Sequence, residues 1–270
     1  VALAPENLPN LDKQWDVVSS FYALVALSGL TMAIKQAAQN PATALAALAA
    51  AAVGAWLFVR RQHRLADPLL TFDIFRSRLF TGGVLAAAGG MFVLAGAELM
   101  TTQKLQLVDA LTPLAAGATV AVMALSAIPA SVLGGAYLHK IGFLPLIAGG
   151  FFGAVVGAVA LATGWTSIGM VLLGLSAGSV MSVSSIAIIG SAPMHRSGMA
   201  AGVEEVSYEL GTLITVALTG SLLQAALDRG ADYTAAYNQV IGVLAAGAAC
   251  FAVATWWCFR DNPKSGGVDA

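Results

Sequence analysis

The sequence predicts an all-α integral membrane protein with eight transmembrane helices. Hydrophobic residues make up 58% of its 270 residues and charged residues only 10%, whereas an average soluble domain carries roughly 25% charge. Too few polar groups are therefore present to cover the surface of a soluble protein of this size. The apolar runs are continuous and do not alternate with polar residues, which favours helices over a β-barrel.

Eight apolar stretches are long enough to cross a bilayer, which needs ~20 residues. They follow a polar segment at 1–16, and the first two, at 17–59, are separated from the others by a basic link at 60–78. The last six occupy 79–259, and a polar tail follows at 260–270. In order, the predicted spans are 17–34, 42–59, 79–103, 112–138, 143–163, 167–192, 199–227 and 236–259.

An even number of spans places both ends of the chain on one side of the membrane, and the positive residues indicate which side. Cytoplasmic loops are enriched in Lys and Arg, so both termini are predicted to be cytoplasmic. The five arginines of the basic link indicate topology and not a nucleic-acid site. The connectors on the side of the termini hold Lys13, Arg60, Arg61, Arg64, Arg76, Arg78, Lys140, Arg196, Arg260 and Lys264, against Lys35, Lys104 and Arg229 on the other side.

Small residues recur in every span, and they allow helix backbones to approach closely in lipid. The fourth span also contains Pro129, followed by Gly134 and Gly135. A proline inside a helix removes one backbone hydrogen bond and kinks the helix. The kink either marks a gate or fits the packing of the bundle, and the sequence leaves both alternatives open.

Ionisable residues inside the spans are rare, and they are the candidate functional residues because a charge in the membrane is costly. The third span contains Glu98, and the seventh contains Glu204, Glu205 and Glu209. At 100° per residue, these three glutamates, Tyr208 and several threonines fall within an arc of about 140° on the seventh span. Such an arc is expected to face protein or a water-filled cavity.

The glutamates of the seventh span lie roughly 8–15 Å along the helix from its predicted start, which reaches as far as the midplane of a ~30 Å hydrocarbon core. A carboxyl group in such surroundings can alternate between a proton and a cation, since poor hydration and neighbouring carboxylates both favour its protonated form. We expect Glu205 or Glu209, in preference to Glu204, to carry this proton, because residues four apart share one helix face. The alternative is a wetted, inert cluster at the cytoplasmic mouth.

Glu98 lies near the outer end of its span and is followed by Thr101, Thr102 and Gln103. It is either an interfacial acid in contact with water or a second group that attracts cations from the outer side.

No cofactor, metal site or catalytic residue is expected. His139 lies at a span end and His195 in a loop, while Cys250 and Cys258 are roughly 12 Å apart along one helix, too far for a disulfide. The spans contain no nucleophile–base pair and no cluster of metal ligands, which argues against an intramembrane enzyme.

Three segments between about residues 67 and 227 carry motifs of a known family. AAGVEEVSYELGTLITVALTGSLL, TTQKLQLVDALTPLAAG and DPLLTFDIFRSRLFTGG resemble, respectively, the thirteenth helix, the junction of helices nine and ten, and the entry to helix nine of the fourteen-span drug/proton antiporters. These form the QacA- and EmrB-like branch of the major facilitator superfamily. AGAELMTTQ is most similar to the methyl viologen resistance (SmvA-like) transporters of that branch.

The resemblance implies that the chain covers helices seven to fourteen, with the two linking helices at 17–59 and the C-terminal six-helix half at 79–259. It also implies export of lipophilic cations (quaternary ammonium compounds, dyes and viologens) across a bacterial inner membrane, driven by the proton gradient. Since the chain begins with Val1 and lacks the family's six N-terminal helices, we expect a fragment whose partner is that missing half. The alternative is a half-bundle that assembles with or regulates a full transporter without transporting.

By position, the resemblance assigns the acidic sites of the thirteenth-helix signature and its aromatic-x-Leu-Gly core to residues of this chain. The corresponding residues are Glu204, Glu205 and Glu209, and Tyr208, Leu210 and Gly211.

The segment GGAYLHKIGFLPLI departs from the superfamily loop Gly-x-Leu-Ala-Asp-Arg-x-Gly-Arg-Arg. His139 stands in place of the aspartate, and Phe143 and Leu144 stand in place of the arginines. The gating role of that loop is therefore not assigned to these residues.

The predicted topology can be tested by cysteine labelling of intact cells, with Cys250 and Cys258 replaced by alanine. A membrane-impermeant thiol reagent is expected to modify Asn40→Cys, which lies in an outer connector, and to leave Ser77→Cys in the basic link unmodified. The reverse labelling pattern would contradict the assignment.

Overall fold

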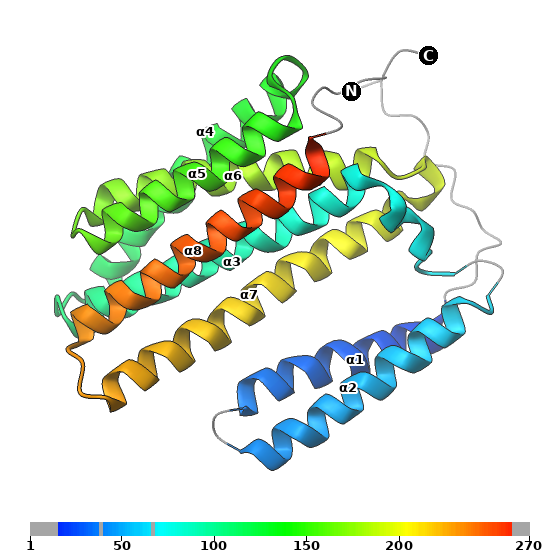
Figure 1. Ribbon diagram of the computed structural model, residues 1–270, viewed down its shortest axis with the longest axis horizontal. Coiled ribbons are helices and arrows are strands. Elements are labelled where there is room, and N and C mark those ends of the chain that lie inside the picture. Colours follow the sequence, from blue (N-terminus) through cyan, green and yellow to red (C-terminus); the bar gives the residue numbers. More distant parts are fainter. Residues whose placement is uncertain (1–15, 38–39, 66–67, 261–270) are drawn as a thin grey trace. The chain divides into compact units, whose positions relative to one another are not determined.

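The computed structural model describes residues 16–37, 40–65 and 68–260, and these form two compact units that are divided between Thr71 and Phe72 (Figure 1). Eight helices within the described residues are long and apolar enough to cross a membrane, so the predicted all-α membrane fold is confirmed. The first unit contains α1 (Val17–Gln36) and α2 (Pro41–Gln62). The second contains η1 (Phe72–Arg76), α3 (Arg78–Leu107), α4 (Pro113–Ile141), α5 (Phe143–Ala162), α6 (Thr166–Gly190), η2 (Met194–Arg196), α7 (Ser197–Asp228) and α8 (Tyr233–Phe259).

Several helices extend beyond the apolar stretches because their ends are set by capping groups and not by hydropathy. The Asn40 side chain accepts from Thr43 N at the start of α2, and the Asp232 side chain accepts from Thr234 N at the start of α8. At the other end of α2 the helix continues to Gln62. The first residues of the predicted 60–78 link are therefore helical.

The first unit is a hairpin whose two helices pack through glycine. A methyl group on Gly29 of α1 would lie 2.8 Å from the Ala51 nitrogen, and one on Gly54 of α2 would lie 2.9 Å from the Ala26 nitrogen. The backbones of α1 and α2 therefore touch directly, as small residues permit in lipid. Most apolar side chains of this hairpin are not buried within the unit.

In the second unit, α3 runs through the middle and packs against α5, α6, α7 and α8 (Figure 1). Gly82 of α3 faces Cys258 and Phe259 near the end of α8, whereas Gly96 faces Leu244, so α3 and α8 are antiparallel. The phenyl rings of Phe92, Phe151 and Phe251 cluster where α3, α5 and α8 meet. This core makes α3 the element that positions the others.

Helices α4 and α6 are parallel neighbours and also pack through glycine. Gly174 and Gly178 of α6 lie against the carbonyl oxygens of Met123 and Ala127 on α4. Further along, Gly134 lies against Ser179 and Gly135 against Ser182.

Pro129 lies on the exposed side of α4, which continues as one helix from Pro113 to Ile141. Gly134 and Gly135 face α6, where a methyl group would lie 3.4 Å and 3.3 Å from the nearest atom. Whether Pro129 and these glycines serve packing or gating stays a prediction.

The contact between α7 and α3 supplies a stability prediction. A methyl group on Gly211 would lie 2.2 Å from the carbonyl oxygen of Ala88, whereas one on Gly220 of the same helix would meet nothing within 4 Å. We expect Gly211→Ala to destabilise the chain by about 1–3 kcal/mol, the usual cost of overpacking. Gly220→Ala is the matched control and is expected to be neutral or slightly stabilising, since alanine favours helix. Thermal unfolding of the two variants in detergent measures the difference, and equal unfolding temperatures would show that Gly211 is not a close contact.

Candidate functional site

The three glutamates of α7 fall on two different edges of the helix. Glu204 is only 8% exposed, whereas Glu205 and Glu209 are both exposed. Since successive residues differ by 100° around a helix, burial of Glu204 turns its neighbour outward. The polar arc predicted from the sequence is therefore divided into a buried edge and an exposed edge.

The buried edge of α7 faces α3. Its residues recur every three or four positions, as expected for one face of a helix, and Gly211 brings the backbone of α7 against Ala88. One turn further, Thr215 Oγ1 lies against Gly96 of α3, which shows that α3 and α7 run parallel. The buried members of this edge are Ala200, Glu204, Ser207, Gly211, Thr215 and Thr219.

Most hydroxyl groups on this edge are satisfied by their own helix. Ser207 Oγ donates to the Val203 carbonyl at 2.6 Å, and Thr219 Oγ1 donates to the Thr215 carbonyl at 2.7 Å. Such i to i−4 hydrogen bonds let a hydroxyl lie in an apolar interface at little cost. Among the described residues, Thr215 Oγ1 is the buried side-chain oxygen that lacks a hydrogen-bond partner.

Glu204 is held by a side-chain hydrogen bond within α7. Tyr208 Oη donates to Glu204 Oε1 at 2.7 Å. The tyrosine ring packs against a cluster contributed by η1, α3, α6 and α7, and its hydroxyl also lies close to that of Ser184 on α6. Sequence reasoning missed this pairing, although the i, i+4 spacing would have indicated it. The buried members of the cluster are Ile74, Phe80, Ala87, Ile188 and Ala200.

Glu205 and Glu209 lie on the exposed edge, four residues apart. Because α7 is helical throughout this region, the predicted placement of both carboxyl groups on one face holds, with Cβ atoms roughly 5–6 Å apart. Val216 lies on the same edge, further along the helix, and is also exposed. The exposed edge thus presents two acids that lie one helical turn apart.

Glu98 is not brought together with the acids of α7. It is exposed on α3 and lies beyond Gly96, which is level with Thr215. Glu204 lies eleven residues before Thr215, so more than about 15 Å separates it from Glu98 along the bundle at 1.5 Å per residue. The chain therefore holds two separate acidic positions at two depths.

The polar residues that follow Glu98 contact α8. Thr101 Oγ1 and Tyr237 Oη are hydrogen-bonded at 3.0 Å, and Tyr233 Oη donates to Gln103 Oε1 at 3.3 Å. The Lys104 ammonium group lies 5.0 Å from the centre of the Tyr237 ring. Thr101 and Gln103 thus join α3 to α8, and they do not extend the Glu98 site.

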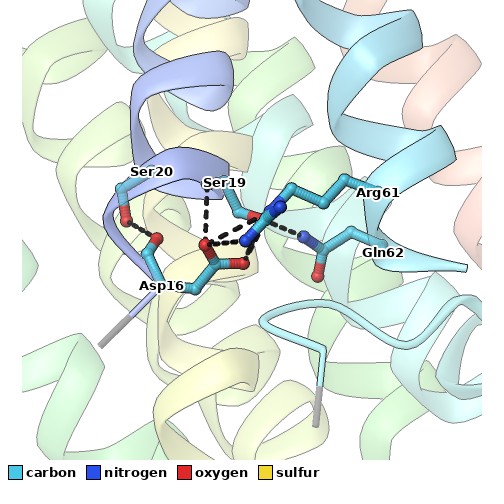
Figure 2. Close-up of polar contacts among 5 residues, drawn as sticks. All are labelled: Asp16, Ser19, Ser20, Arg61 and Gln62. Carbon is cyan, nitrogen blue, oxygen red and sulfur yellow. Dashed lines mark hydrogen bonds and ion pairs between the residues drawn. The ribbon is translucent and has the colours of Figure 1, made fainter. Parts of the chain in front are cut away.

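A further acid, Asp16, belongs to a structural cluster in the α1–α2 hairpin (Figure 2). Arg61 Nη2 of α2 lies 2.9 Å from Asp16 Oδ1, and Gln62 Nε2 donates to Ser19 Oγ at 2.8 Å. Hydrogen bonds from Arg61 and Ser19 hold the pKa of Asp16 well below its usual range. Asp16 therefore stays ionised and acts as an ion-pair partner, not as a group that exchanges protons.

In the sequence Arg61 is only a topology signal, and its pairing with Asp16 has no local pattern that predicts it. Lys13 and Lys264, which also contribute to the predicted topology, lie outside the described residues.

Comparison with known proteins adds an independent line of evidence. No protein-family model matches the chain. The chain is 32% identical to the multidrug efflux pump LfrA of Mycolicibacterium smegmatis over 97% of its own length and 56% of LfrA. It is 30% identical to the drug efflux pump JefA of Mycobacterium tuberculosis, over 73% of the chain and 40% of JefA, and 30% identical to the methyl viologen resistance protein SmvA of Salmonella typhimurium, over 62% of the chain and 35% of SmvA. The chain thus spans about half or less of the length of the curated relatives that it matches.

Proposed function

We propose that the chain forms part of a transporter that exports lipophilic cations in exchange for protons, because it is related in sequence to multidrug efflux pumps of the major facilitator superfamily. Quaternary ammonium compounds, dyes and viologens are the proposed substrates. The proposed location is a bacterial cytoplasmic membrane, with both termini in the cytoplasm, on the basis of the Lys and Arg distribution.

The observation that carries this proposal is the acid pair on the exposed edge of α7. Glu205 and Glu209 are exposed on a helix that is otherwise long and apolar enough to cross a membrane. Carboxylates at this depth are costly in lipid and are retained where they serve a pathway. They attract a cation, whereas their apolar neighbours accommodate its hydrophobic groups.

The proposed proton coupling rests on the proximity of the two carboxyl groups. Two neighbouring carboxylates repel each other, and either a proton or a cation relieves that repulsion, so the two ligands compete for the pair. Arrival of a cation favours the doubly ionised pair and releases the proton. After the cation leaves on the outer side, a proton returns from there and resets the site.

The opposite wall of the transport path is proposed to come from a separate bundle of six helices. In this kind of transporter the substrate site lies between two halves that move against each other.

The cavity enclosed by α3, α5 and α6, lined by Val93, Phe151 and Val180 among others, has a volume of about 10 Å³. It holds about one water molecule, whereas drug-sized sites measure about 300–1,000 Å³. The exposed faces, not this cavity, are the candidate transport surface.

The acid pair can be tested in a transporter that contains this chain together with an N-terminal six-helix half. Glu205→Gln and Glu209→Gln each keep the shape of the side chain and remove its charge. At least one of them is expected to abolish drug-induced proton release in detergent and to reduce dye efflux at least about tenfold, which corresponds to roughly 1.4 kcal/mol. Asp228→Asn, at the far end of the same helix, is the control and is expected to export like the parent. If both glutamine variants release protons and export monovalent cations normally, the paired-carboxylate mechanism is wrong.

Glu98 is expected to affect substrate range more than coupling, because it lies at a different depth from the α7 acids. In the same transporter, Glu98→Gln should weaken resistance to some cations more than to others, while proton release with the remaining substrates stays intact. Resistance profiles across a panel of mono- and divalent cations measure this effect. Uniform loss of all proton-driven export would place Glu98 in the coupling step instead.

A further inference from the structure

Tyr208 occupies the place where α6 and α7 approach each other on the side of α3. Its ring is partly buried against the apolar cluster that η1, α3, α6 and α7 form, and its hydroxyl donates to Glu204 at 2.7 Å while lying close to Ser184 of α6. The tyrosine thus contacts a neighbouring helix with its ring and an acid of its own helix with its hydroxyl.

Glu204 needs such a donor because of where its backbone places it. The residue is 8% exposed and lies beside an apolar cluster, where an unpaired carboxyl group is costly. Among the described residues, Tyr208 supplies the hydrogen bond that this carboxylate receives. Without that donor, the flexible Glu204 side chain would lower its free energy by turning toward the exposed edge, where its carboxylate can be hydrated. Glu205 and Glu209 lie on that edge.

We propose that Tyr208 is a positioning residue: its hydroxyl holds the Glu204 carboxylate on the buried edge of α7, and so keeps this acid out of the exposed Glu205–Glu209 pair. The inference rests on the proposed function in one respect, the assignment of the exposed pair to cation binding. A third carboxylate swinging into that pair would change its charge and compete for the same cation. Tyr208 therefore affects how readily the exposed pair exchanges its ligands.

The position of Glu204 can be measured without transport. The full 270-residue chain, in lipid nanodiscs, is treated with a carbodiimide, and modification of each glutamate is quantified by mass spectrometry. Tyr208→Phe keeps the ring and removes the donor. We expect modification of Glu204 to increase about fivefold, the change in population that accompanies loss of a typical net hydrogen bond, while Glu205 and Glu209 keep their reactivity.

Tyr237→Phe is the matched control. Tyr237 is a buried tyrosine whose hydroxyl is hydrogen-bonded to Thr101, so the same chemical change is made far from Glu204. Glu204 reactivity is expected to match the parent in this variant. Thermal unfolding of both variants establishes that each is folded. Parental reactivity of Glu204 in Tyr208→Phe, or an equal increase in both variants, would overturn the inference.

Transport kinetics distinguish positioning from direct cation binding. In a transporter that contains this chain and an N-terminal half, Tyr208→Phe is expected to lower the maximal rate of cation export about fivefold without raising KM, since a third carboxylate beside the pair adds attraction for the cation and slows its release. A raised KM with an unchanged maximal rate would contradict the positioning role. If the parent transporter exports no cations, the proposed function fails, whereas the labelling result still decides whether Tyr208 positions Glu204.

Discussion

The rotation of α7 about its own axis depends on one close contact, that of Gly211 with the backbone of α3. No side chain larger than hydrogen fits there, because a methyl group would lie 2.2 Å from the Ala88 carbonyl oxygen. Since each residue is turned by 100° from the one before it, fixing Gly211 inward also fixes Glu204 inward and Glu205 and Glu209 outward. The chemical difference between these glutamates therefore begins with a packing contact of the backbone, to which Tyr208 adds a hydrogen bond to Glu204.

The same interface shows how a polar helix edge is accommodated at low cost. Ser207 and Thr219 bond to carbonyl groups of their own helix, so they need no partner on α3. Asp16 in the α1–α2 hairpin is accommodated differently, because its carboxylate forms an ion pair with Arg61 of the neighbouring helix. Such a pair stabilises a hairpin but cannot release and rebind a proton at ordinary pH, because the guanidinium group keeps the acid ionised.

The sequence was sufficient to predict the eight helices, because apolar runs of bilayer length allow few other structures. Helix ends such as those of α2 and α8 were less predictable, since capping by Asn40 or Asp232 carries a helix past its apolar residues. The polar arc of α7 was predicted as one surface and is in fact divided. A helical wheel gives the angle between two residues, but it does not show which neighbouring helix covers each angle. The contact of Asp16 with Arg61 joins residues far apart in sequence and has no local signature.

Side chains that are exposed on the two units of the chain differ in how well lipid can cover them. The exposed residues of α1 and α2 include Phe21, Leu45 and Trp56, which lipid can cover without cost. Lipid is a poor neighbour for Glu205 and Glu209, because an ionised carboxylate in the hydrocarbon core costs a few kcal/mol. That edge of α7 requires water or further protein beside it, whereas its buried edge is already covered by α3. The position of the acids thus indicates which face of the second unit is left for water or further protein, and it does so independently of any likeness to known proteins.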